Sequence, residues 1–322
     1  MKAYVYGTNG AEITDIAKPS AKGTQVLVHV RACGLNRADL GMTKGHAHGS
    51  AGGAGTVLGM EWAGEIAEIG PEARGVKVGD RVMGSGSAAF AEYTLADQAR
   101  LFHAPSNMNF EEACTLPIAL TTMHNAVVTI GALQAGQTVL IQGASSGVGL
   151  MAMQIAKLKG AGLVIGSSTD AMRRGRLKEF GADLAVDSSD PGWVDQVLQA
   201  TSGEGVDLIV DQISGKVASQ NLKAAKIKGR IVNVGRLGGT HADFNFDLHA
   251  ARRINYIGVT FRTRTMEEIR EIFDEVRKDI WPAVESRKLQ LPIDKVFAFG
   301  DIGKAFAHME ANKHLGKIVV TL

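Results

Sequence analysis

The chain has 322 residues, a length that predicts about two domains, and 45% hydrophobic with 21% charged residues is a globular composition. This composition excludes a disordered chain, a fibrous protein and a coiled coil. The chain has 35 Lys and Arg residues and 33 Asp and Glu residues, so its formal net charge is only +2. A protein that binds nucleic acid or a membrane surface is therefore not expected.

The first hundred residues contain short runs rich in β-forming residues, separated by Gly, Pro and Asp turns. The runs cover residues 3–6, 26–32, 64–69, 81–83 and 91–95. Short strands at this spacing, with few helical stretches between them, predict a compact and largely antiparallel β domain.

From about Ala113 the pattern changes to apolar runs that alternate with stretches of helical period. The runs cover residues 138–141, 163–165, 184–186, 208–210, 231–234 and 256–259. This alternation predicts a parallel sheet covered by helices on both faces. Helices are expected at 148–159 and at 265–288, the second of them bent or ended by Pro282.

Strands return near residues 296–299 and 318–321. We therefore predict an α/β protein in which a doubly wound parallel sheet is inserted into a mostly antiparallel β domain built from both ends of the chain. The expected boundaries are 1–120 with 263–322 for the β domain, and 121–262 for the inserted domain.

Residues 139–157 carry the clearest chemical motif: a strand, then Gly143, Gly147 and Gly149, then an amphipathic helix. Glycines allow a tight turn and close approach to a pyrophosphate, whose charge the free N–H groups at the helix start stabilise. The inserted domain is thus predicted to be a Rossmann dinucleotide-binding domain, with residues 146–149 (Ser146, Gly147, Val148 and Gly149) at the phosphates.

An NAD-specific site usually places an acidic residue at the end of the second strand, where this chain has Ser167. Without that carboxylate a 2′-phosphate is not repelled, and Ser167, Ser168, Arg173 or Arg174 can bind it. The pattern favours NADPH over NADH. The alternative is that Arg173 and Arg174 are simply solvated at a helix start.

The glycine loop also fits short-chain dehydrogenases, but Tyr256 is the only tyrosine after it, and the Lys expected four residues later is Thr260. The chain instead resembles medium-chain dehydrogenase/reductases, in particular the zinc-free quinone oxidoreductase group related to zeta-crystallin. The matching segments, in the order typical of that family, are ACGLNRADL at 32–40, GMEWAGEIAEIG at 59–70, VKVGDRVMG at 76–84, FAEY at 90–93, GRIVNVG at 229–235 and GKIVV at 316–320.

The resemblance implies a GroES-like β domain and no catalytic zinc. Zinc-dependent relatives have Cys and His ligands where this chain has Asn36 and Met60, and methionine is a poor zinc ligand. The only cysteines, Cys33 and Cys114, provide neither a disulfide framework nor a cysteine-rich zinc lobe. Glu61 is expected to remain as a structural carboxylate in the cleft.

The resemblance further implies NADPH-dependent transfer of hydride to a quinone or to the C=C bond of an α,β-unsaturated carbonyl. Asn36 and Asp39 are then expected beside the nicotinamide, and further cofactor contacts are expected from Thr121, Gly235, Arg236 and Phe261. Each polar side chain also has a structural alternative: a turn-capping amide for Asn36, a helix-start carboxylate for Asp39 and an N-cap for Thr121.

One departure from the family affects the proton donor. Where many relatives have a pocket tyrosine, this chain has His46 and His48 in a glycine-rich segment, 45–55, that we predict to be a flexible lid. Either imidazole can replace the tyrosine because it titrates near neutral pH. The alternative is that both histidines are exposed, and two such residues without a third ligand do not predict a metal site.

The remaining expectations concern partners and location. By resemblance, the last parallel strand, near residues 256–261, pairs with its copy in a homodimer. The absence of an apolar leader or a long apolar stretch favours a cytoplasmic protein. Two other functions stay open: a zinc-free alcohol or carbonyl reductase, and an NADPH-binding protein without turnover that is crystallin-like or RNA-binding.

Overall fold

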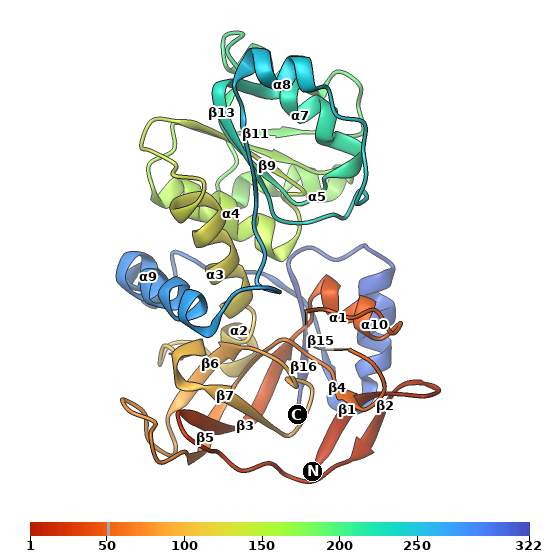
Figure 1. Cartoon of the computed structure of the whole chain (residues 1–322), viewed down its shortest axis with the longest axis vertical. Coiled ribbons are helices and arrows are strands. Elements are labelled where there is room, and N and C mark those ends of the chain that lie inside the picture. The colour runs from red at the N-terminus through yellow and green to blue at the C-terminus, as the bar shows by residue number, and fades with distance from the viewer. Residues whose placement is uncertain (50–51) are drawn as a thin grey trace. The chain divides into compact units, whose positions relative to one another are not determined.

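The computed structural model describes residues 1–49 and 52–322 (Figure 1). The chain forms two compact units, one of residues Met1–Thr121 with Phe261–Leu322 and one of residues Thr122–Thr260. We call them the β unit and the Rossmann unit. None of the helices formed by the described residues is long and apolar enough to cross a membrane.

The β unit contains two sheets. Its strands are β1 (Lys2–Gly7), β2 (Gly10–Asp15), β3 (Gln25–Gly34), β4 (Thr56–Val57), β5 (Glu61–Ile69), β6 (Arg81–Ser85), β7 (Tyr93–Asp97), β8 (Leu101–His103), β15 (Ile293–Ala298) and β16 (Lys317–Thr321). One sheet has the order β2-β1-β4 and the other β15-β16-β3-β5-β6-β8, with β7 pairing β3. Among the described residues of this unit, only β15 and β16 pair in parallel, so the predicted, mostly antiparallel domain is confirmed.

The strands of the β unit bury alternate side chains because successive residues point to opposite faces. In β3, Val26, Val28 and Val30 face a core that also contains Trp62 and Phe90. The helices around it are α1 (Arg37–Met42), α2 (Phe110–Ala113), α9 (Met266–Glu285) and α10 (Ile302–Glu310), with α3 (Pro117–His124) running on into the Rossmann unit.

Helix α9 begins where its sequence predicts. Thr265 is the N-cap and exchanges hydrogen bonds with Glu268, which satisfies two N–H groups at the helix start. Pro282 lies inside the helix, which continues to Glu285. Phe273 and Trp281 stack on Phe102 of β8 and hold this helix on the sheet.

The Rossmann unit has one sheet of six strands that are all parallel, in the order β11-β10-β9-β12-β13-β14. The strands are β9 (Thr138–Gln142), β10 (Leu163–Ser167), β11 (Leu184–Val186), β12 (Val206–Asp211), β13 (Ala225–Asn233) and β14 (Asn255–Gly258). Each predicted apolar run forms one strand, which confirms the doubly wound sheet. The predicted end of the last strand, near residue 261, is wrong, because β14 ends at Gly258.

Helices cover both faces of this sheet. They are α4 (Gly147–Leu158), α5 (Ala171–Gly175), α6 (Trp193–Ala200), α7 (Ala218–Ala224) and α8 (Phe246–Arg252). Leu140, Ile209 and Ile231 share a buried cluster with residues of α6 and α7, whereas α4 contacts β9 and β10 without joining it. The strand order reverses between β9 and β12, and ligands of doubly wound sheets bind at such a point, beyond the carboxyl ends of the strands.

Candidate functional site

The glycine loop lies between the end of β9 at Gln142 and the start of α4 at Gly147. Gly143 has a φ of +73°, a conformation that favours glycine. A Cβ on Gly149 would lie 2.6 Å from the carbonyl oxygen of Gly143, so the first turn of α4 packs directly on the loop. Ser146 caps the helix by accepting the Gly149 N–H at 3.1 Å.

The start of α4 has free donors. Within the described part of the chain, the N–H groups of Gly147 and Val148 have no acceptor, as expected of the first residues of a helix. Together with the helix dipole they stabilise a negative charge at this position. These residues therefore fit the pyrophosphate of a dinucleotide.

Ser167 is fully buried at the end of β10. Its hydroxyl donates to Gln142 Oε1 at 2.6 Å and accepts the Gly143 N–H at 3.1 Å. Ser167 thus supports the glycine loop from within the protein. The direct contact with a 2′-phosphate that the sequence predicts for it would require these bonds to break.

Two arginines follow β10 in α5. Asp170 caps that helix by accepting the Arg173 N–H at 2.8 Å, and the Arg173 guanidinium lies 3.5 Å from the same carboxylate. Arg174 donates to the Ser168 carbonyl oxygen at 2.8 Å and pairs with Asp187 at 2.9 Å. Each arginine is thus paired with a carboxylate near the end of the second strand, and their contact with a 2′-phosphate stays a prediction.

The loops after β12 and β13 lie at the same edge of the sheet. A Cβ on Gly235 would lie 2.6 Å from the Gln212 carbonyl oxygen, so these two loops are in close contact. The Gln212 side chain is 2.9 Å from the Ser146 hydroxyl, which joins the β12 loop to the glycine loop. The Arg236 guanidinium donates to the Val234 carbonyl oxygen at 3.3 Å.

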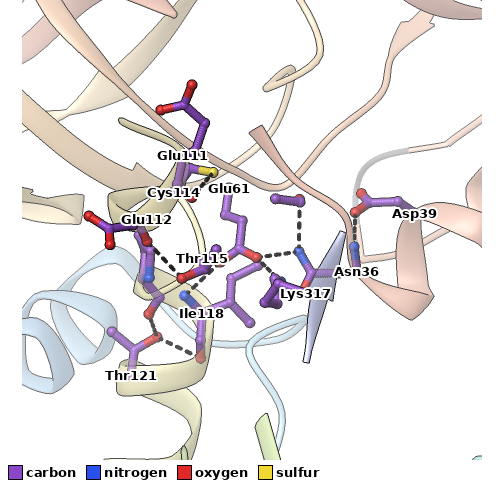
Figure 2. Close-up of polar contacts among 12 residues, drawn as sticks. Asn36, Asp39, Glu61, Glu111, Glu112, Cys114, Thr115, Ile118, Thr121 and Lys317 are labelled. Atoms are coloured by element: carbon purple, nitrogen blue, oxygen red, sulfur yellow. Dashed lines mark hydrogen bonds and ion pairs between the residues drawn. The ribbon is translucent and has the colours of Figure 1, made fainter. Parts of the chain in front are cut away.

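In the β unit, a buried ion pair joins Glu61 of β5 to Lys317 of β16 (Figure 2). Lys317 also donates to Asn36 Oδ1 at 3.0 Å, and the Asn36 amide donates to Glu61 Oε1 at 3.0 Å. The other carboxylate oxygen accepts the N–H of Ile118 in α3 at 3.1 Å. Burial raises the pKa of Glu61, and the Lys317 ammonium opposes that rise.

Lys317 is a member of this buried group that the sequence analysis did not predict. Its side chain is only 6% exposed, although it stands in an apolar strand. A lysine is almost never fully buried unless it is paired, so a lysine at the start of the apolar run at 317–320 was itself a signal for a buried carboxylate partner.

Asp39 is fully buried in the first turn of α1, as its helix-start alternative predicts. Its Oδ2 accepts the Asn36 N–H at 2.8 Å, and its Oδ1 has no hydrogen-bond partner among the described residues. Burial raises the pKa of Asp39 to about 7, against the opposing effects of that N–H and of Lys317. The carboxyl group therefore holds a proton in a substantial fraction of molecules at neutral pH.

This pKa makes the stability of the protein depend on pH. The pKa of Asp39 in the folded protein lies above its ordinary value of 3.8. The stability that the protonated Asp39 carboxyl contributes is therefore fully present below pH 4 and is lost as the pH rises through 7. Asp39→Asn should remove a loss of up to about 4 kcal/mol between those limits. Urea unfolding of both proteins from pH 4 to 8 measures it, with Asp15→Asn, a surface carboxylate, as the control. Parallel pH curves for wild type and Asp39→Asn would contradict it.

The other predicted residues of the β unit have different surroundings. Thr121 lies inside α3 and donates to the Pro117 carbonyl oxygen at 2.7 Å, so the N-cap alternative is wrong. His46 is exposed and His48 is half-buried, where burial and then the charge of Arg262 lower its pKa. Phe261 is partly buried.

The predicted lid includes Ser50 and Ala51, which lie outside the described residues. Across residues 1–49 and 52–322, no three His, Cys, Asp or Glu side chains come together as a metal site. The predicted residues thus fall into two sets. Asn36 and Asp39 meet in the β unit, and the glycine loop, Ser167, Ser168, Arg173, Gly235 and Arg236 lie at one edge of the Rossmann sheet.

Comparison with known proteins agrees with both folds. Residues 22–106 match the alcohol dehydrogenase GroES-like domain, and residues 147–278 match the zinc-binding dehydrogenase domain. A highly reducing polyketide synthase from Penicillium crustosum is 30% identical over 304 residues, which are 92% of this chain and 12% of that protein. The chain spans only 12–14% of the length of the first curated relatives, which are polyketide synthases.

Solved structures extend the match to the whole chain. An alcohol dehydrogenase superfamily protein from Novosphingobium aromaticivorans is 28% identical with a TM-score of 0.90, covering 100% of this chain and 99% of that one. A quinone oxidoreductase from Pseudomonas syringae pv. Tomato DC3000 has a TM-score of 0.88 with full coverage of both chains, and at 23% identity it shows the fold alone.

A GroES-like domain joined to a dinucleotide-binding domain defines a class of oxidoreductases that bind a nicotinamide cofactor. The chain belongs to the medium-chain dehydrogenase/reductase family.

Proposed function

We propose that this protein is an NADPH-dependent reductase that transfers hydride to a quinone or to the C=C bond of an α,β-unsaturated carbonyl without a metal. The observation that supports the choice of cofactor is that β10 ends in Ser167 and is followed by Ser168 rather than by a carboxylate, with Arg173 and Arg174, which pair with Asp170 and Asp187, in the next helix. A guanidinium favours a 2′-phosphate there, and a carboxylate would repel it.

The chain's own residues bind and orient the reactants. In the Rossmann unit, the N–H groups of Gly147 and Val148 hold the pyrophosphate, Arg173 and Ser168 bind the 2′-phosphate, and Gly235 and Arg236 are further cofactor contacts. Thr121 and Phe261 of the β unit are the cofactor contacts that the family resemblance implies there. Ser167 acts indirectly by holding the glycine loop in shape. When bound, the cofactor supplies the hydride.

Reduction of an enone needs a proton at the α carbon in addition to hydride at the β carbon. Asn36, Asp39, His46 and His48 are the candidate groups around the substrate. Asp39 holds a proton near neutral pH, and the Glu61–Lys317 pair fixes the Asn36 amide. Asn36 stands where zinc-dependent relatives have a ligand, and its amide is already engaged by that pair.

Consumption of NADPH with a panel of quinones, enones and aldehydes tests the proposal. We expect oxidation with quinones or enones, slower oxidation of NADH and no effect of a chelator. Turnover of aldehydes alone would instead support the carbonyl reductase, and loss of activity with a chelator would overturn the metal-free mechanism. No turnover of any substrate, with NADPH still bound, would favour the non-catalytic alternative.

We further propose a cytoplasmic homodimer. Strand β14 ends the order of the Rossmann sheet, and Phe246 in the preceding helix is 76% exposed, so a second copy can pair with this edge. Cys33 and Cys114 are buried free thiols, which suits a reducing compartment. A monomeric mass in sedimentation equilibrium at micromolar concentration would refute the dimer.

A further inference from the structure

A cavity of about 280 Å³ lies within the Rossmann unit, beside the carboxyl ends of β12 and β13. It is bounded by the loop after β12, the start of α7, the segment after β13 and one residue of β14. The side chains that matter here are Ser214, Asn233, Arg236, His241 and Tyr256. Ligand sites of drug-sized molecules begin at about 300 Å³, so this cavity fits one end of a ligand.

The polar wall of the cavity is fixed by a chain of hydrogen bonds. Ser214 donates to the Gly235 carbonyl oxygen at 2.6 Å and accepts from the Asn233 amide. Burial and then the charge of Asp211 raise the pKa of Tyr256, and the Asn233 side chain opposes this rise. The Tyr256 hydroxyl can donate a hydrogen bond as well as accept one.

Arg236 and His241 are the basic residues that line the cavity. Arg236 carries a permanent charge, and His241 lies with its Nδ1 2.9 Å from the Thr240 hydroxyl. When Thr240 donates to Nδ1, the neutral imidazole carries its proton on Nε2 and is a donor as well. No aspartate or glutamate is among the residues that line this cavity.

Among the described residues, Asp211 at the end of β12 forms no ion pair with Arg236, although the Arg236 charge lowers the pKa of Asp211 against the effect of burial. Its oxygens accept the N–H groups of Ile213 and Ser214, both at 2.8 Å, and the Asn221 amide at 3.0 Å. Burial raises the pKa of Asp211, so the surroundings also disfavour its charged form. The cavity therefore offers donors and positive charge to whatever enters it.

We propose that this cavity binds an anionic group of the substrate, a carboxylate or a phosphate, through Arg236, His241 and Tyr256. The inference rests on the proposed function, because the cavity lies at the sheet edge that carries the proposed dinucleotide loop. The glycine loop follows β9, and β12 separates β9 from β13, so the cavity lies to one side of the pyrophosphate position. The substrate is then an enone or quinone that carries an acidic group.

The kinetic test compares 4-phenylbut-3-en-2-one with analogues that carry a carboxylate or a phosphate ester on the ring. We expect kcat/KM to be about 10- to 100-fold higher for an anionic analogue, a ratio typical of hydrogen bonds to a charged group. The better of the two anions identifies the group. Arg236→Met, assayed with saturating NADPH because Arg236 is also a proposed cofactor contact, should bring the ratio close to one, and Tyr256→Phe should lower it partly. Arg253→Met, which removes an arginine outside the cavity, is the matched control and should keep the ratio.

Equal kcat/KM for neutral and anionic enones would overturn the anion site, as would a kcat/KM ratio that is unchanged in Arg236→Met. Neither result would contradict the proposed reductase activity. If no enone is reduced, binding of inorganic phosphate and benzoate, measured by calorimetry against chloride at equal ionic strength, decides the site alone. Binding that is lost in Arg236→Met and kept in Arg253→Met supports the cavity. Absence of binding to wild type, or binding unchanged by Arg236→Met, refutes it.

Discussion

Lys317→Met is expected to lower the free energy of unfolding by about 3–5 kcal/mol, the cost of leaving one member of a buried ion pair unpaired. Glu61 is fully buried and would keep only the donors of Asn36 and Ile118. The pair joins β5 to β16 and, through Asn36 and Ile118, reaches the starts of α1 and α3. Urea unfolding at pH 7 measures the loss.

Two further variants separate the buried pair from a general effect of charge. The double variant Lys317→Met, Glu61→Leu should recover most of the stability, because no unpaired charge remains. Lys157→Met removes a lysine from a surface pair with Asp183 and should cost less than about 1 kcal/mol. A loss for Lys317→Met no larger than that for Lys157→Met would contradict the prediction.

Gly149→Val is expected to weaken NADPH binding at least about 100-fold, which is about 2.7 kcal/mol. The first side-chain carbon would lie 2.6 Å from the Gly143 carbonyl oxygen and 2.7 Å from the Ala144 Cα, so the glycine loop has to move away from the helix start. The N–H groups of Gly147 and Val148 then no longer converge on one phosphate. Quenching of protein fluorescence or calorimetry with NADPH measures the dissociation constant.

The matched control is Gly175→Ala in α5, where an added carbon meets nothing within 4 Å. It should bind NADPH as wild type does and keep or slightly raise the stability. Far-ultraviolet circular dichroism establishes that Gly149→Val remains folded. A folded Gly149→Val protein with wild-type affinity would show that the cofactor does not use this loop.

Much of the fold was predictable because its signals are local. Six apolar runs became six parallel strands, and the glycine loop formed between a strand and a helix, since periodicity and turn residues act over a few neighbouring positions. The end of β14 was missed because apolar residues continue past Gly258, whereas the partner strand β13 ends at Asn233. Such boundaries depend on the partner strand.

The candidate site was predicted less completely. Ser167 was correctly placed at the end of β10, but its side chain faces Gln142 and supports the loop, a direction that depends on packing beneath the sheet edge. The proposed anion-binding cavity combines Ser214, Asn233, Arg236 and Tyr256, which come from two loops and two strands. No spacing in the sequence relates them.

The sequence by itself determined the two kinds of domain, their order, the dinucleotide loop and the family, because each follows from short motifs whose physical role is local. Tertiary structure alone decided the partner of Glu61, which is Lys317 at a distance of 256 residues along the chain, and the raised pKa of Asp39. Both depend on removal of charged groups from water, and burial is a property of the assembled core, which single residues in a sequence do not carry.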